Sequence, residues 1–131
     1  MMASKQQGEK IFLNAWLWEF HRANPQWTRV RLGPVPNPAQ AKVFSVLLRW
    51  ADAVFLEDGN LVIVEFKINP NFGAIGQLLG YKMLIKATPA FENYVAWNVK
   101  MLLVTKFPDL AVTELASKFD IEHEIWNPDE K

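Results

Sequence analysis

Cysteine is absent from this chain of 131 residues. Without thiols the chain forms neither a disulfide nor a thiolate metal site, and a cysteine nucleophile is excluded. Long apolar runs are absent as well, because no stretch approaches the ~20 residues that a helix needs to cross a bilayer. The first residues do not follow the pattern of a signal peptide. These absences indicate no membrane partner and are compatible with a reducing cytosol.

The chain also lacks a surplus of charge, because its 14 lysines and arginines balance its 14 aspartates and glutamates. Proteins that coat nucleic acid without sequence preference usually carry a basic surplus, since neutralising phosphate supplies much of the affinity. Any nucleic-acid binding must therefore depend on locally concentrated basic groups, on a metal ion or on partners. Tryptophan is plentiful, with six residues. Most should lie in the core, while one or two could stack on bases or fill a protein interface.

Length and composition indicate one globular domain. Half of the residues are hydrophobic and 21% are charged, which is ordinary for a soluble domain with a genuine core. We find no internal repeat and no low-complexity segment. We therefore expect a single domain over residues 1–131, in which the polar segment 1–7 is flexible.

Residues 49–67 are typical of a β-hairpin. Two β-rich runs flank an Asp-Gly dipeptide at 58–59, which suits a two-residue turn because both positions tolerate positive φ. A tight turn pairs Glu57 with Asn60, and the same register brings Asp52 opposite Glu65. Residues opposite each other on an antiparallel pair share a face, with Cβ atoms ~5 Å apart. The hairpin therefore predicts two neighbouring carboxylates.

One face of this hairpin gathers charged groups. Because side chains alternate along a strand, Lys67 shares the face of Glu65, whereas Val62, Val64 and Phe66 point to the other face. Two carboxylates beside apolar walls suit a hard cation such as Mg²⁺, which takes one or two carboxylates and completes its shell with water and phosphate oxygens. The alternative is a solvent-exposed salt-bridge cluster with no further role.

The same residues resemble the active-site signature of the PD-(D/E)XK nuclease superfamily, which has an aspartate, a hydrophobic hairpin and a Glu-x-Lys. Here these are Asp52 and Glu65-x-Lys67, and the residue before the aspartate is alanine where the superfamily usually has proline. The following helix carries Gln77 and Tyr81, similar to the Gln-x-x-x-Tyr motif of the RecB-like branch with its Cas4-type and λ-exonuclease-type enzymes. The resemblance spans nearly the whole chain.

This resemblance implies hydrolysis of phosphodiester bonds with one or two Mg²⁺ or Mn²⁺ ions. Asp52, Glu65 and the backbone carbonyl of Phe66 would hold the metal. Lys67 would orient or activate the attacking water, or neutralise charge in the transition state. The glutamine and tyrosine of the following helix would touch the scissile strand.

A further metal ligand is expected from the first helix, which the apolar periodicity predicts over residues 8–23. Glu9 falls on its apolar face in the first turn, where a carboxylate also suits the helix dipole. Glu19 projects about 80° away from that face, and His21 lies at the far end of the helix. In some members of the superfamily an acidic residue on this helix completes the metal shell. Glu9 matches that position better than the other two.

The remaining segments predict an α/β order. We expect a strand at 26–32 in which Trp27, Arg29 and Arg31 form a basic face, then a rigid proline-rich loop at 33–39 and a short helix or strand at 42–48. Beyond the hairpin we expect a helix at 72–87, a strand at 99–105, a helix at 108–118 and a strand at 120–126. The order α-β-β-β-α-β-α-β predicts a restriction-endonuclease-like fold, with helices on both faces of a mixed sheet.

Three functions follow as hypotheses. The first is a Mg²⁺- or Mn²⁺-dependent deoxyribonuclease, either an exonuclease or a structure-selective enzyme, of a phage or mobile element. It would act in the cytoplasm of a bacterium or an infected host, on DNA in preference to RNA. The second is a site-specific endonuclease subunit that takes its specificity from a partner. The third is a non-catalytic structural or interaction protein with a nuclease fold. A protein partner or homo-oligomer is left open.

Overall fold

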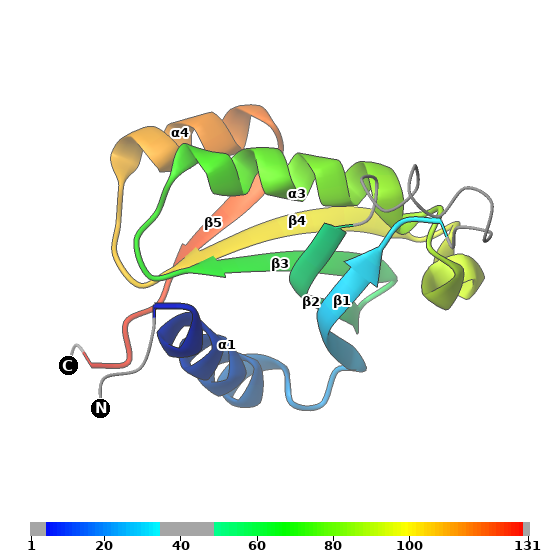
Figure 1. Cartoon of the computed structure of the whole chain (residues 1–131), viewed down its shortest axis with the longest axis horizontal. Coiled ribbons are helices and arrows are strands. Elements are labelled where there is room, and N and C mark those ends of the chain that lie inside the picture. Colours follow the sequence, from blue (N-terminus) through cyan, green and yellow to red (C-terminus); the bar gives the residue numbers. More distant parts are fainter. Residues whose placement is uncertain (1–4, 35–48, 130–131) are drawn as a thin grey trace.

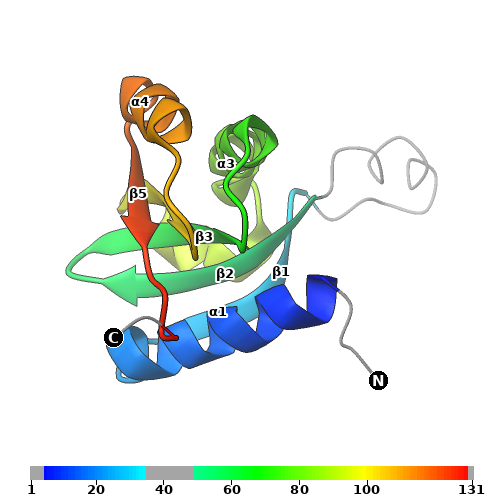
Figure 2. The ribbon, with the colours of Figure 1, turned by 90° about the vertical axis from the view of Figure 1, so that its left-hand side faces the viewer.

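The computed structural model describes residues 5–34 and 49–129, and side chains within 8–34 and 50–129. One sheet, with strand order β1-β2-β3-β4-β5, forms the middle layer. Helix α1 lies on one face of the sheet, and helices α3 and α4 lie on the other (Figures 1 and 2). The elements are α1 Lys5–His21, β1 Gln26–Leu32, β2 Arg49–Glu57, β3 Asn60–Lys67, α3 Phe72–Ile85, the 3₁₀ helix η2 Pro89–Tyr94, β4 Asn98–Thr105, α4 Leu110–Lys118 and β5 Ile121–Ile125.

The β2–β3 hairpin has the predicted turn and register. Asp58 and Gly59 have φ values of 51° and 80°, as a two-residue turn with two left-handed positions requires. Glu57 pairs with Asn60, and the antiparallel ladder continues to Ala53 and Val64. The next pair that the register predicts, Asp52 with Glu65, lies beyond the end of this ladder. Strands β3, β4 and β5 then run parallel, with α3 and α4 as the crossover connections. The sheet is therefore mixed, as predicted.

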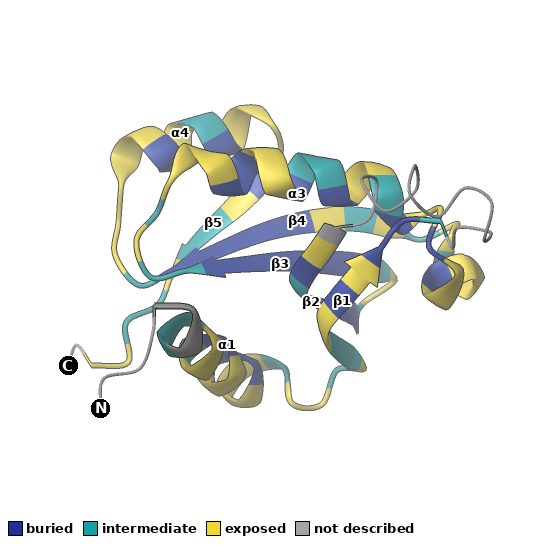
Figure 3. Cartoon of the chain, viewed as in Figure 1, coloured by how far each residue is buried: buried dark blue, intermediate teal, exposed yellow. Residues whose placement is uncertain are grey.

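Two apolar cores fill the space on either side of the sheet, and β3 and β4 are buried along most of their length (Figure 3). The α1-side core comprises Leu13, Trp16, Leu17, Ala53, Phe55, Val62, Val64, Phe66, Leu102 and Val104. The α3-side core includes Val30, Leu32, Ala51, Val54, Leu56, Leu61, Ile63, Ile75, Leu78, Tyr81, Phe91 and Leu103. Alternate residues of β3 enter opposite cores, which confirms the predicted division of that strand.

Strand β1 does not alternate as expected. Trp27 packs against the α3-side core, edge-to-face on Phe91 with ring centroids 5.0 Å apart. Val30 and Leu32 are buried in that same core. The strand changes face at Arg29, whose φ of 49° is left-handed and costs a non-glycine residue ~1–2 kcal/mol. The prediction that Trp27 shares a face with the two arginines of this strand is therefore wrong.

Helix ends follow their capping residues. The Asn71 side chain accepts a hydrogen bond from the Ala74 amide at 2.9 Å and begins α3, and Asp109 caps α4 through Val112 at 3.2 Å. Helix α3 ends at Ile85 rather than at residue 87, and η2 was not predicted. The structure does not describe residues 35–48. Most of the loop expected at 33–39 and all of the element expected at 42–48 therefore lie outside the described residues. No helix in the described ranges is long and apolar enough to cross a bilayer.

Two glycines allow a matched test of backbone conformation. A Cβ added at Gly76, inside α3, or at Gly59, in the hairpin turn, meets no heavy atom within 4 Å. The positions differ in backbone conformation, because Gly59 has a φ of 80°. Gly76→Ala should raise the free energy of unfolding by ~0.5–1 kcal/mol, and Gly59→Ala should lower it by ~1 kcal/mol. Urea denaturation of both variants measures the difference. A Gly76→Ala variant less stable than wild type would contradict the described helix.

Candidate active site

Strand β3 extends beyond its pairing with β2, and carboxylates accept its free amides. The Phe66 amide donates to Asp52 Oδ2 at 2.8 Å, and the Ile68 amide donates to Glu9 Oε2 at 2.9 Å. The N–H and C=O of one strand residue point to the same neighbour, so the Phe66 carbonyl also points to this edge. The structure thus places Asp52 and that carbonyl on one edge of β3, and it places Glu9 at Ile68, the residue that follows the strand.

A distortion shared by β1 and β2 accompanies this position of Asp52. In β2, Val54 faces the α3-side core and Ala53 the α1-side core. Strict alternation would send Ala51 to the α1 side, yet it is buried in the α3-side core. The β1–β2 pairing is regular on either side of Asp52 and of Arg29, which lies at the same level of the neighbouring strand. Such local distortions re-aim side chains, and here Asp52 reaches the amide of β3.

Glu65 is a buried carboxyl group without full compensation. Its side chain is 3% exposed, and Oε2 has no hydrogen-bond partner among the described residues. Burial, then the charge and hydrogen bond of Asp52, raise the pKa of Glu65 to about 9, although Lys67 and Tyr81 oppose the shift. The Lys67 ammonium lies 3.7 Å from Oε1. The expected group of two carboxylates and one ammonium is therefore present, but Glu65 is buried and Asp52 and Lys67 are only partly exposed, so it is not a surface salt-bridge cluster.

The two residues of the Gln-x-x-x-Tyr pattern differ in their surroundings. Tyr81 is 3% exposed and donates its hydroxyl hydrogen to the Trp50 carbonyl at 2.8 Å. It also takes part in the hydrogen bonding that lowers the pKa of Glu65. Gln77, one turn earlier on α3, is exposed. Tyr81 thus joins α3 to β2 beside Asp52, and contact of either side chain with a substrate stays a prediction.

The other candidates on α1 lie away from this edge. His21 stacks on Phe55 with ring centroids 4.0 Å apart, and its Nδ1 is 3.5 Å from Glu57 at the turn end of β2. Glu19 is exposed. Glu9 alone of the three candidates bonds to the end of β3 where the carboxylates gather.

The donor set suits a hard divalent cation. Carboxylate and carbonyl oxygens are the ligands that Mg²⁺ and Mn²⁺ prefer. The observation that favours a cation here is the buried Oε2 of Glu65, which has no hydrogen-bond partner in the described part of the chain. Within residues 8–34 and 50–129, no three or more His, Cys, Asp or Glu side chains are grouped so that they could hold a metal ion. A metal at this edge would therefore depend on the Asp52–Glu65 pair, the carbonyl and non-protein ligands.

Sequence reasoning missed the environment of Trp50 and the conformation of Arg29. Trp50 is half exposed and has two guanidinium groups near its ring. Its position two residues before Asp52 was a signal that the sequence did offer. The left-handed backbone of Arg29 had no such signal, because arginine rarely adopts it.

The raised pKa of Glu65 makes the stability of the metal-free protein depend on pH. The unfolded chain releases this proton near pH 4.5, whereas the folded protein keeps it up to about pH 9. Between these values the folded state binds more protons, so the free energy of unfolding falls as the pH rises. Urea denaturation in EDTA from pH 5.5 to 8.5 should show this fall, and Glu65→Gln should remove most of it. Glu19→Gln, at an exposed position, is the control and should keep the fall. An equal pH dependence in all three proteins would refute the assignment.

Comparison with known proteins gives matches in structure alone. No protein-family model and no curated protein matches the chain. A repair endonuclease from Pyrococcus abyssi has 19% identity and a TM-score of 0.55, over 98% of this chain and 50% of that one. EndoMS in a complex with double-stranded DNA has 17% identity and a TM-score of 0.60, over 100% of this chain and 48% of that one. The chain spans about half the length of both. The likeness confirms the predicted endonuclease-like α/β fold.

Proposed function

We propose that this domain is a nuclease that hydrolyses phosphodiester bonds in DNA with the help of Mg²⁺ or Mn²⁺. The observation that carries the proposal is the carboxylate pair of Asp52 on β2 and Glu65 on β3. Burial, then the charge of Asp52, raises the pKa of Glu65, and Glu65 Oε2 is buried with no hydrogen-bond partner among the residues that the structure describes. Burying such a pair costs stability, and a bound cation would offset that cost. Both structural neighbours are named as endonucleases, and one of them is bound to DNA.

Each residue of the pair and its surroundings has a defined part in the proposed reaction. Asp52, Glu65 and the Phe66 carbonyl would hold the ion, which when bound lowers the pKa of a water molecule and stabilises charge on the phosphoryl oxygens. Glu65 must lose its proton to serve as a ligand. Lys67, partly exposed beside Glu65, would orient the attacking water or neutralise charge on the phosphate. Glu9 would hold the end of β3 and offer an outer ligand.

The names of the neighbours favour cleavage within a strand. The repair endonuclease and EndoMS support a structure-selective endonuclease over an exonuclease. The chain covers only half of either protein, so their activities as whole proteins are not carried over. Membership of the RecB-like branch, origin in a phage or mobile element, a partner-dependent site-specific activity and a cytoplasmic location stay predictions.

Removal of one carboxylate charge tests the metal site. Asp52→Asn keeps an oxygen that can accept the Phe66 amide but removes the charge, so the variant should fold. Mn²⁺ should raise the melting temperature of wild type, because a ligand of the folded state alone stabilises it by RT ln(1 + [L]/Kd). Asp52→Asn should lose most of that rise, and its cleavage of labelled linear and circular DNA should fall by at least ~100-fold.

Asp58→Asn is the matched control, because it removes a carboxylate from the exposed turn of the same hairpin, where asparagine tolerates positive φ. It should keep both the metal response and any cleavage. If neither Mg²⁺ nor Mn²⁺ raises the melting temperature of wild type, the hypothesis of a metal-dependent nuclease is wrong. Full cleavage by Asp52→Asn would remove this residue from the site.

Tyr81 allows a test of the hydrogen bond that joins α3 to β2 beside the candidate site. Tyr81→Phe leaves the Trp50 carbonyl without its donor, so the free energy of unfolding should fall by ~1–2 kcal/mol. Cleavage should fall as well, because α3 is no longer bonded to the strand that carries Asp52. Tyr94→Phe removes a hydroxyl from a partly buried tyrosine of η2 and serves as the control. Gln77→Ala should keep wild-type stability and lose turnover only if this exposed residue contacts the substrate. An unchanged stability of Tyr81→Phe would show that its bond to Trp50 is not formed in solution.

A further inference from the structure

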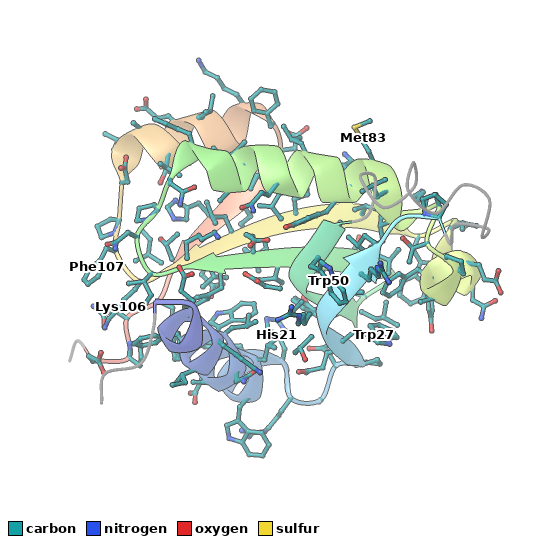
Figure 4. All side chains as sticks on the ribbon, viewed as in Figure 1. His21, Trp27, Trp50, Met83, Lys106 and Phe107 are labelled. Atoms are coloured by element: carbon teal, nitrogen blue, oxygen red, sulfur yellow. The ribbon has the colours of Figure 1, made fainter. Side chains whose placement is uncertain are left out.

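The β1–β2 side of the sheet carries an exposed indole with two cations near its ring. The Arg29 and Arg31 guanidinium carbons lie 5.2 and 5.6 Å from the centroid of the Trp50 ring. Trp50 is 49% exposed, and both arginine side chains are exposed too. Figure 4 labels Trp50 where β1 and β2 lie side by side. We call these three side chains the Trp50 platform.

The packing of the fold does not account for this platform. Trp50 belongs to neither apolar core, although Ala51, the next residue, is fully buried. Neither arginine takes part in an ion pair within the described ranges. In a chain with zero formal charge, two arginines that are two residues apart on one strand, with no ion pair among the described residues, are a local concentration of positive charge. Such a concentration is what phosphate binding by this chain would need.

The platform is fixed to the candidate active site by the backbone. The Trp50 carbonyl accepts the Tyr81 hydroxyl at 2.8 Å, and Tyr81 in turn interacts with Glu65. Arg29 lies at the level of Asp52 in the neighbouring strand. Alternation with the buried Ala51 puts the Trp50 side chain on the α1 face of the sheet, whereas Glu65 lies on the α3 face. A strand of substrate held on the platform would reach the carboxylates by passing the end of the β2–β3 ladder.

We propose that the Trp50 platform binds an unpaired segment of the DNA substrate. The Trp50 indole stacks on an unpaired base, and Arg29 and Arg31 contact the adjoining phosphates. This proposal rests on the proposed nuclease function and names its substrate class as DNA with a single-stranded segment beside the cleaved bond. An exposed indole offers a π-face that any base can stack on, but a base within a duplex already has both faces covered. The flanking guanidiniums match the phosphates on either side of such a base.

Binding without metal tests the platform separately from catalysis. Fluorescence anisotropy in EDTA measures the affinity for three labelled DNAs: a single strand, a duplex with a short overhang and a blunt duplex. Trp50→Ala should weaken the first two by about 5- to 150-fold, the range expected for loss of one stacked base, and should leave the blunt duplex nearly unchanged. Trp50→Phe should retain most of the affinity. Arg31→Ala should reduce the salt dependence of binding by about one phosphate contact.

Trp18 provides the matched control. Trp18 lies on α1 and is 67% exposed. The guanidinium carbon of Arg22, just after the helix, is 5.2 Å from the centroid of its ring. Trp18→Ala removes an equivalent indole–guanidinium contact elsewhere on the surface and should bind all three DNAs like wild type. Equal losses in Trp18→Ala and Trp50→Ala, or an equal loss on the blunt duplex, would overturn the proposal.

Two outcomes separate this proposal from the proposed function. If Trp50→Ala binds and cleaves overhang DNA like wild type, the platform is refuted while the nuclease assignment stands. If wild type neither binds DNA nor responds to Mn²⁺, both fail. Binding of a protein at Trp50, with no loss of DNA affinity in Trp50→Ala, would also refute the proposal.

Discussion

The hydrogen bond between the Phe66 amide and Asp52 Oδ2 determines how the candidate site is built. Strand β3 continues past the last residue of β2 that pairs with it, and a partly buried amide without an acceptor costs ~1–3 kcal/mol. The Asp52 carboxylate accepts the hydrogen bond of this amide, so the position of Asp52 is fixed in the absence of a ligand. Asp52 has a second oxygen, Oδ1, and the adjacent Phe66 carbonyl faces the same edge. Oδ2 of Asp52 thus accepts the backbone hydrogen bond, and Oδ1 is the atom that would bind the proposed metal ion.

Glu65 has the opposite energetic role. Its carboxyl is as buried as the apolar residues beside it, and its pKa is raised to about 9 chiefly because burial disfavours the charged form. The protein therefore tolerates a group that lowers its stability at neutral pH, at the place where a cation would reverse that effect. Tyr81 opposes the shift and fixes the Trp50 carbonyl. Packing alone does not explain a buried carboxyl group with this cost, and this supports the proposed metal site.

The parts of this arrangement that depend on local pattern could be predicted from the sequence. Asp58-Gly59 defines the turn, and period-2 alternation from Leu61 to Phe66 then sets the face of every β3 side chain. The bounds of β1 were predicted correctly. The faces of its side chains could not be predicted in the same way, because Trp27 packs on Phe91, a residue of η2 distant in the chain. That packing and the core positions later in β1 require the left-handed Arg29. The bond from Glu9 to Ile68 is likewise tertiary, although the helical face of Glu9 was correctly placed toward the sheet.

The geometry of the candidate site depends on the register of the β2–β3 hairpin. Asp52 comes from the beginning of β2 and Glu65 from the end of β3, and a two-residue turn brings these ends together. Most substitutions elsewhere leave that geometry intact if the two apolar cores remain filled. One residue added to the hairpin would instead turn Glu65 to the other face, among the side chains under α1. The candidate site is therefore specified by strand length and turn type as much as by its charged residues.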